Sequence, residues 1–169
     1  ANNAIVGYGL SVVTACHLRR HLALCAKIFS RYGEKNFTIT NEVAKWLEGS
    51  FEVLKKYSAE TETSDGKVRL NFLCDMGAVL DDYKKVIYHG RFSGRTEYSY
   101  GNLCRFFELA LKYVNDTIRQ NKTEDGFYHS YNLLDRKGEG IEIRRLFLML
   151  EGQVAVLGCN LLSGKEACE

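Results

Sequence analysis

The chain has 169 residues, of which 46% are hydrophobic and 26% charged, and its 23 basic and 21 acidic residues leave a formal net charge of +2. This composition is that of a globular domain with a substantial core, and it excludes an intrinsically disordered chain. The evenly mixed charges argue against a nucleic-acid partner, and the lack of an uncharged apolar run of about 18 residues argues against a membrane-spanning helix.

The first four predicted elements are helices, because apolar residues recur in them at every third or fourth position. They cover residues 5–32, 40–57, 69–88 and 99–121, and proline is absent from the chain, so nothing interrupts them. Thr40 or Asn41 is a good N-cap for the second helix. The segment Thr61–Gly66, TETSDG, predicts a loop between the second and third helices.

The next stretch, Asp125–Gly140, has the sequence DGFYHSYNLLDRKGEG, with three glycines, three aromatic residues and no helical period. It predicts a structured, non-helical connection. A fifth helix follows, from about Ile141 to Leu162. Its runs LFLML (146–150) and VAVL (154–157) are apolar all round, which is typical of a helix enclosed by others.

Ser163 and Glu166 have the spacing of a capping box, which announces a sixth helix. Only three residues follow Glu166, and a single turn is not a stable helix. We therefore expect a fragment of a larger protein that ends inside a helix. The expected fold is all-α: residues 1–169 form a single domain of antiparallel helical hairpins.

The cysteines and histidines give no sign of a metal site. Six cysteines occur without a CxxC pair, and we expect all six to be reduced, as in a cytoplasmic protein. No signal peptide is visible, which agrees with that location. His17 and His21 have the i,i+4 spacing of helical metal ligands, but the HExxH pattern is missing and Arg19 and Arg20 would repel a cation. No cofactor and no metal is expected.

Glu151 is the candidate catalytic residue, because it lies between Leu150 and Gly152 in the most apolar segment of the chain. A carboxylate in such surroundings requires a partner, a cavity or a raised pKa, and functional carboxylates often arise in this way. The alternative is a structural role, in a buried ion pair or a hydrogen bond to a neighbouring loop.

The candidate substrate-binding residues lie in the stretch before the fifth helix: Asp125, Tyr128, His129, Tyr131 and Asn132. Carbohydrate sites favour this mixture, since aromatic faces cover the C–H surface of a sugar while polar groups bind its hydroxyls. The alternative is a buried loop whose tyrosines pack and whose His129 and Asn132 bond to the backbone.

Two segments, DGFYHSYNLL (125–134) and LFLMLEGQVAVL (146–157), resemble parts of very large bacterial proteins labelled cellobiose-phosphorylase-like or uncharacterised. The resemblance implies a partial (α/α) toroid around a carbohydrate-binding mouth. It places Tyr128, His129, Tyr131, Asn132 and Glu151 in the recurring motifs. It also implies that the chain belongs to a glycoside hydrolase-like or phosphorylase-like protein, with carbohydrate and the rest of the parent chain as partners.

The alternative function, from a different class, is a helical scaffold or protein-interaction module without catalysis. A cleft lined by Tyr128, His129 and Glu151 would support the carbohydrate hypothesis, and burial of all three in a closed bundle would support the scaffold. In both cases we expect the isolated chain to expose apolar surface and to self-associate.

Overall fold

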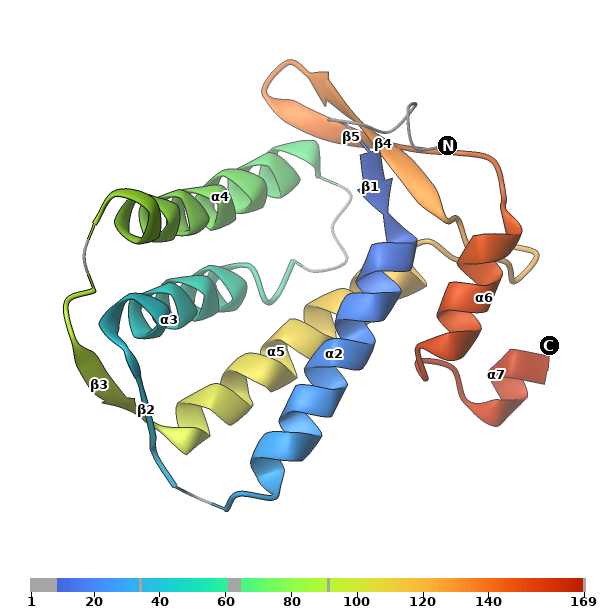
Figure 1. Ribbon diagram of the computed structural model, residues 1–169. Coiled ribbons are helices and arrows are strands. Elements are labelled where there is room, and N and C mark those ends of the chain that lie inside the picture. The colour runs from blue at the N-terminus through green and yellow to red at the C-terminus, as the bar shows by residue number, and fades with distance from the viewer. Residues whose placement is uncertain (1–8, 34, 61–64, 91, 169) are drawn as a thin grey trace.

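The computed structural model describes residues 9–33, 35–60, 65–90 and 92–168. In chain order the elements are β1 (Gly9–Ser11), α2 (Val12–Ser30), β2 (Phe37–Thr40), α3 (Asn41–Lys56), α4 (Gly66–His89), β3 (Arg95–Tyr98), α5 (Tyr100–Arg119), β4 (Tyr131–Lys137), β5 (Gly140–Arg145), α6 (Leu150–Gly158) and α7 (Gly164–Cys168). Helices α2 and α5 lie side by side in the centre, with α3 and α4 on one side and α6 and α7 on the other (Figure 1).

The prediction of an all-α fold is wrong, and so is that of a partial (α/α) toroid built of antiparallel helical hairpins. The described residues also form two antiparallel sheets, one with the strand order β1-β4-β5 and one that pairs β2 with β3. β1 occupies part of the first predicted helix, whose first residues, 5–8, lie outside the described ranges. β2 and β3 lie just before α3 and α5, in segments of four residues that are too short to show an alternating pattern.

The predicted fifth helix divides into a strand, an extended link and a short helix. Lys137 pairs with Gly140 across a two-residue turn, and the hairpin continues to the pair of Asn132 with Arg145. Ile141 and Ile143 alternate with polar residues, which is the period of a strand, and β-branched side chains favour that conformation. Residues 146–149 form neither helix nor strand, and Met149, the last of them, has an extended backbone, so that α6 begins at Leu150.

Three helical predictions are confirmed almost to their ends. The segments predicted at 40–57, 69–88 and 99–121 are α3, α4 and α5. The Thr40 hydroxyl accepts a hydrogen bond of 3.4 Å from the Val43 N–H, as expected of an N-cap. The capping box is also present, since the Ser163 N–H donates to Glu166 and the Glu166 N–H donates to Ser163.

The core has two parts that meet along α2 and α5. One joins the start of α2 to the end of α5 and to α6: Val12, Cys16, Ile118, Tyr128, Val156, Cys159 and Leu161. The other joins α2 and α5 to α3 and β3: Leu22, Ala44, Leu54, Tyr98, Leu103, Phe107 and Ala110. Arg19 connects α2 to its neighbours, because it donates 2.8 Å to Asn115 Oδ1 and also donates to the Cys159 carbonyl.

Helix α6 is not enclosed, contrary to the prediction from its composition. It buries Gly152 and Val156, but Leu150, Val154 and Leu157 are 79%, 61% and 52% exposed. These three residues are spaced i, i+4 and i+7, so they lie on one face of the helix. In the part of the chain that the structure describes, no helix is long and apolar enough to cross a membrane.

Candidate functional site

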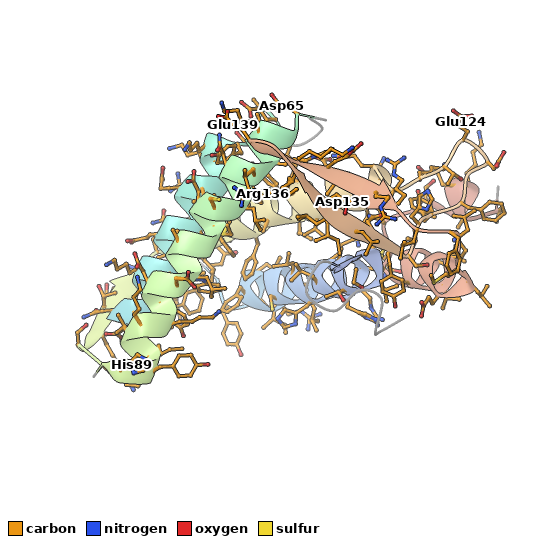
Figure 2. The ribbon with its side chains drawn as sticks, turned by 90° about the horizontal axis from the view of Figure 1, so that it is seen from above. Asp65, His89, Glu124, Asp135, Arg136 and Glu139 are labelled. Atoms are coloured by element: carbon orange, nitrogen blue, oxygen red, sulfur yellow. The ribbon has the colours of Figure 1, made fainter. Side chains whose placement is uncertain are left out.

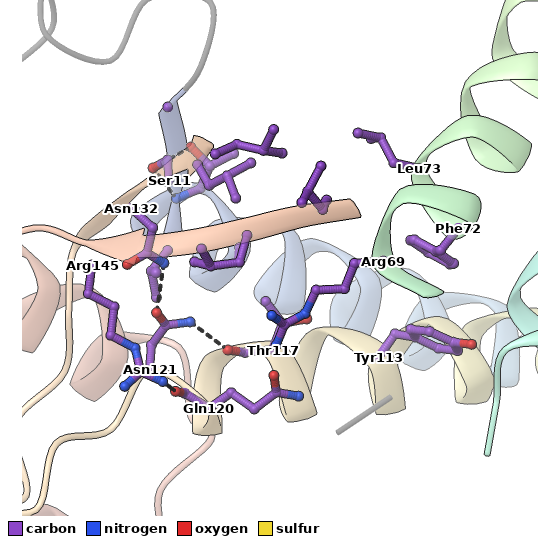
Figure 3. Close-up of a pocket in the computed structure, with 18 of the residues that line it drawn as sticks. Ser11, Arg69, Phe72, Leu73, Tyr113, Thr117, Gln120, Asn121, Asn132 and Arg145 are labelled. Carbon is purple, nitrogen blue, oxygen red and sulfur yellow. Dashed lines mark hydrogen bonds between the residues drawn. The ribbon is translucent and has the colours of Figure 1, made fainter. Parts of the chain in front are cut away.

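A pocket of about 970 Å³ lies between the sheet β1-β4-β5 and the helices α2, α4 and α5 (Figure 3). This volume falls in the range of small-molecule sites, about 300–1,000 Å³. The pocket depends on the contact of α4 with the hairpin, where Lys67 forms an ion pair of 3.0 Å with Glu139. Figure 2 shows Glu139 close to Asp65, at the end of α4 that meets the hairpin. Residues between 9 and 15 and residues between 132 and 145 both line the pocket, so segments far apart in the sequence build one cavity.

One wall of the pocket is aromatic and comes from α3, α4 and α5. Phe72 stacks on Tyr113 with 5.5 Å between ring centroids, and it meets Tyr57 edge to face at 5.6 Å. The Tyr113 hydroxyl donates a hydrogen bond of 2.6 Å to the Leu54 carbonyl. Burial raises the pKa of Tyr113 to about 12, so that its hydroxyl keeps its proton into the alkaline range.

The opposite wall carries two buried amides, Asn121 after α5 and Asn132 on β4. Asn132 Nδ2 donates 2.8 Å to Asn121 Oδ1, and Asn121 Nδ2 donates 2.8 Å to the Thr117 carbonyl. Asn132 is 3% exposed, and its Oδ1 has no hydrogen-bond partner among the described residues. An unpartnered buried acceptor costs about 1–3 kcal/mol, so a ligand that donates to it is favoured.

Charged residues lie around these walls. Arg145 donates a hydrogen bond of 2.6 Å from Nη2 to the Gln120 carbonyl. Arg69 reaches from α4 toward Thr117 (Figure 3). Glu60 is the acidic residue among those that line the described pocket, and its side chain is exposed. The lining is therefore more basic than acidic.

The structure separates the sequence-predicted site residues. Asn132 lines the pocket, whereas Tyr131 lies beside Glu151, because neighbouring residues of a strand point to opposite faces. Partial burial raises the pKa of Tyr131, and the neighbouring Glu151 carboxylate adds to this. Glu151 itself is exposed in the first turn of α6, where a carboxylate is stabilised by the helix dipole. The expectation that Glu151 has apolar surroundings is wrong.

Tyr128 and His129 have structural partners. Tyr128 is buried in the core, and Gln153 binds both of its backbone groups: the Tyr128 N–H donates 2.9 Å to Gln153 Oε1, and Gln153 Nε2 donates 2.7 Å to the Tyr128 carbonyl. His129 Nδ1 lies 2.7 Å from the Leu146 carbonyl. The loop lies against the start of α6. It forms no cleft there with Glu151 among the described pockets.

Asp125 is exposed in the turn after α5. Its neighbour Glu124 lies at the end of the molecule remote from α4 and the hairpin (Figure 2). Asp125 therefore does not reach the pocket. Of the five predicted binding residues, Asn132 is the one that lines it.

Sequence reasoning missed Arg69, Asn121 and Arg145. Arg69 and Asn121 were interpreted as parts of helices, and Arg145 was placed in the fifth one. A signal did exist in the alternation of Asn132 with Leu134 and of Ile141 with Ile143, which predicts a hairpin with one buried face. A prediction of the hairpin would still not have shown which helices pack against it.

One of the two histidines on α2 lies beside a further metal-ligand type, because His21 Nε2 is 3.5 Å from Cys25 Sγ. Across the described ranges, no group of three or more His, Cys, Asp or Glu side chains is placed to hold a metal ion.

Comparison with known proteins gives the pocket no precedent. No protein-family model matches the chain, and no curated protein matches it.

Proposed function

We propose that the pocket between the sheet and helices α2, α4 and α5 binds a carbohydrate, and that the chain is the ligand-binding part of a larger carbohydrate-active protein. The observation that carries this proposal is Asn132, which lines the pocket and whose buried Oδ1 has no partner among the described residues. A sugar hydroxyl donates one hydrogen bond and accepts others, so it satisfies an acceptor of this kind. The resemblance of residues 125–134 to carbohydrate-active proteins agrees with it.

The two walls fit the two kinds of surface on a sugar. The rings of Tyr57, Phe72 and Tyr113 supply an apolar wall. The amides of Asn121 and Asn132 supply polar groups in fixed positions. Small-molecule sites combine apolar lining with a few precisely placed polar groups in this way.

The proposal is one of binding and does not extend to catalysis. Glycoside cleavage usually uses two carboxylates on either side of the bond. Glu151 does not line the pocket, and Glu60 is the acidic residue that does, among the described residues. We therefore assign Glu151 no catalytic role in this proposal.

A second candidate function, a protein-interaction module, is favoured by the apolar face of α6. Leu150, Val154 and Leu157 are exposed together on that face. Contiguous exposed apolar surface marks interaction sites. The rest of a parent chain is the partner that this reading proposes.

We infer a cytoplasmic location from the cysteines. All six are free in the structure, including the buried pair Cys16 and Cys159. Proteins with many free thiols are typical of reducing compartments. A count of six free thiols in protein purified and stored without a reducing agent would agree with this location. A disulfide in freshly isolated protein would contradict it.

The test of the proposed function is a titration with neutral mono- and disaccharides, followed by NMR of the labelled chain at up to about 10 mM sugar, where millimolar affinities are visible. Leu73 lines the pocket and is half exposed, so Leu73→Trp fills the cavity without breaking the core. Leu80→Trp is the matched control, since Leu80 lies two turns further along α4 and outside the pocket.

We expect added sugar to change the NMR chemical shifts of Asn121 and Asn132 in the wild type and in Leu80→Trp. These changes should be absent in Leu73→Trp. Circular dichroism verifies that both variants keep the fold. Binding that is equally strong in Leu73→Trp, or no binding by any sugar, would contradict the proposal.

A further inference from the structure

Arg69 is the group in the pocket whose chemistry the proposed function does not yet use. Arg19 and Arg69 are the two half-buried arginines of the described chain, and the other described arginines are exposed. Arg19 has two hydrogen-bond acceptors, Asn115 Oδ1 and the Cys159 carbonyl. Of these two arginines, Arg69 is the one that lines the pocket.

The guanidinium of Arg69 has neither a hydrogen-bond acceptor nor an ion-pair partner among the described residues, and it faces the cavity (Figure 3). A guanidinium carries five N–H donors in a planar fork, which matches the two oxygens of a carboxylate or phosphate. A half-buried arginine without a partner has lost part of its hydration without replacement. An anion in the pocket supplies that replacement.

Two further features of the pocket agree with an anionic ligand. Arg145 adds a second positive charge, and its bond to the Gln120 carbonyl uses one Nη2 donor of its guanidinium. Glu60, the acidic residue of the lining, is exposed to solvent, where its charge is screened. The other polar groups named in the wall are neutral amides.

We propose that the ligand is an acidic sugar, and that Arg69 binds its carboxylate or phosphate while Asn132 Oδ1 accepts a hydrogen bond from one of its hydroxyls. This inference rests on the proposed function and adds the substrate class. Arg69 and Asn132 line the same cavity, and they come from opposite walls, α4 and β4. A ligand held between them must therefore carry an acid and a hydroxyl on one small molecule.

The experiment compares glucose, glucuronate and glucose 6-phosphate in calorimetric titrations of the full chain at low salt, with acetate and inorganic phosphate as probes of the anion alone. Arg69→Gln removes the charge and keeps much of the side-chain length. Arg136→Gln is the matched control, because Arg136 is exposed on β4 and outside the pocket.

We expect at least one of the two acids to bind at least about tenfold more tightly than glucose, a difference that equals about 1.4 kcal/mol. Added salt should reduce the difference. Arg69→Gln should lower the affinity for that acid to the affinity for glucose, and it should leave the affinity for glucose unchanged. Arg136→Gln should change neither affinity. The acid with the larger preference identifies carboxylate or phosphate as the group bound.

The outcomes separate this inference from the proposed function. If glucose binds as tightly as both acids, or if Arg69→Gln lowers the affinity for all three sugars equally, the ligand is not an acidic sugar, but the proposal of carbohydrate binding still stands. Binding of phosphate or acetate without any sugar overturns the carbohydrate and leaves the anion site. No binding of any probe overturns both.

Discussion

Tyr131 and Asn132 are neighbours on β4 and serve different sides of the sheet. Tyr131 reaches Glu151 at the start of α6, and Asn132 reaches Asn121 beside the pocket. The sequence motif had placed both in one site. Strand geometry separates them, because a strand alternates its side chains between two faces.

Asn121→Ala should destabilise the protein by about 1–3 kcal/mol, because it removes the acceptor of the buried Nδ2 of Asn132. Urea unfolding measures this change. Asn71→Ala on α4 is the control, since Asn71 is exposed and alanine is the better helix former. Equal stability of Asn121→Ala and wild type would show that the buried amide pair does not hold the sheet against α5.

The buried thiol of Cys16 should make stability fall at alkaline pH. Burial, together with the contact with Cys159, raises the pKa of Cys16 from 9.0 to about 12. Above about pH 9 the unfolded chain loses this proton while the folded chain keeps it, so stability declines as pH rises toward about 12. Urea unfolding at a series of pH values from about 8 to about 9 measures the slope while tyrosines, with an ordinary pKa of about 10, are still mostly protonated.

Cys16→Ala should make that decline shallower, because the variant has no thiol to titrate at this position. Cys74→Ala is the matched control: Cys74 is exposed on α4, and the variant should keep the wild-type slope. The same slope in all three proteins would contradict the role of Cys16.

At the scale of elements, α6 is held against the loop before β4 by a close approach of Gly152. A Cβ atom at Gly152 would lie 2.4 Å from Ser130 Oγ and 3.1 Å from Ser130 Cα. Gly152→Ala should therefore destabilise the protein by about 1–3 kcal/mol through overpacking. Thermal unfolding measures the effect.

Gly158→Ala is the control for this prediction, because nothing lies within 4 Å of a Cβ at the last residue of α6. It should be neutral or stabilising, as expected of alanine in a helix. If the two alanine variants unfolded at the same temperature, the contact between α6 and Ser130 would have no energetic weight.

Sequence patterns predicted the helices α3, α4 and α5 because each of them packs one face and repeats it every turn. The strands could not be found in the same way. β1 has three residues, and it becomes a strand by pairing with β4. The candidate site was predicted in part: Asn132 was named, but its partners come from α4, α5 and β5, and their meeting depends on tertiary packing.

At the scale of the whole molecule, the exposed face of α6 should make the isolated chain self-associate. Leu150, Val154 and Leu157 leave contiguous apolar surface in water. Sedimentation velocity over a range of concentrations should show a growing fraction of larger species. The double variant Leu150→Gln with Val154→Gln should reduce that fraction.

Leu24→Gln is the control for this surface, since Leu24 is 55% exposed on α2. It should associate as the wild type does. A wild type that stays monomeric at every concentration, or a double variant that associates as strongly, would contradict the role of α6.

The pairing of β1 with β4 joins residues 9–11 to residues 131–133, which are 120 to 124 positions apart in the sequence. Loop closure over such a separation is slow, so this strand pair belongs to the late events of folding. β1 and β4 both supply pocket residues, and the site is therefore completed after the helices have formed. A ligand in the pocket should then slow unfolding and leave the folding rate unchanged, because the transition state has nothing yet to bind.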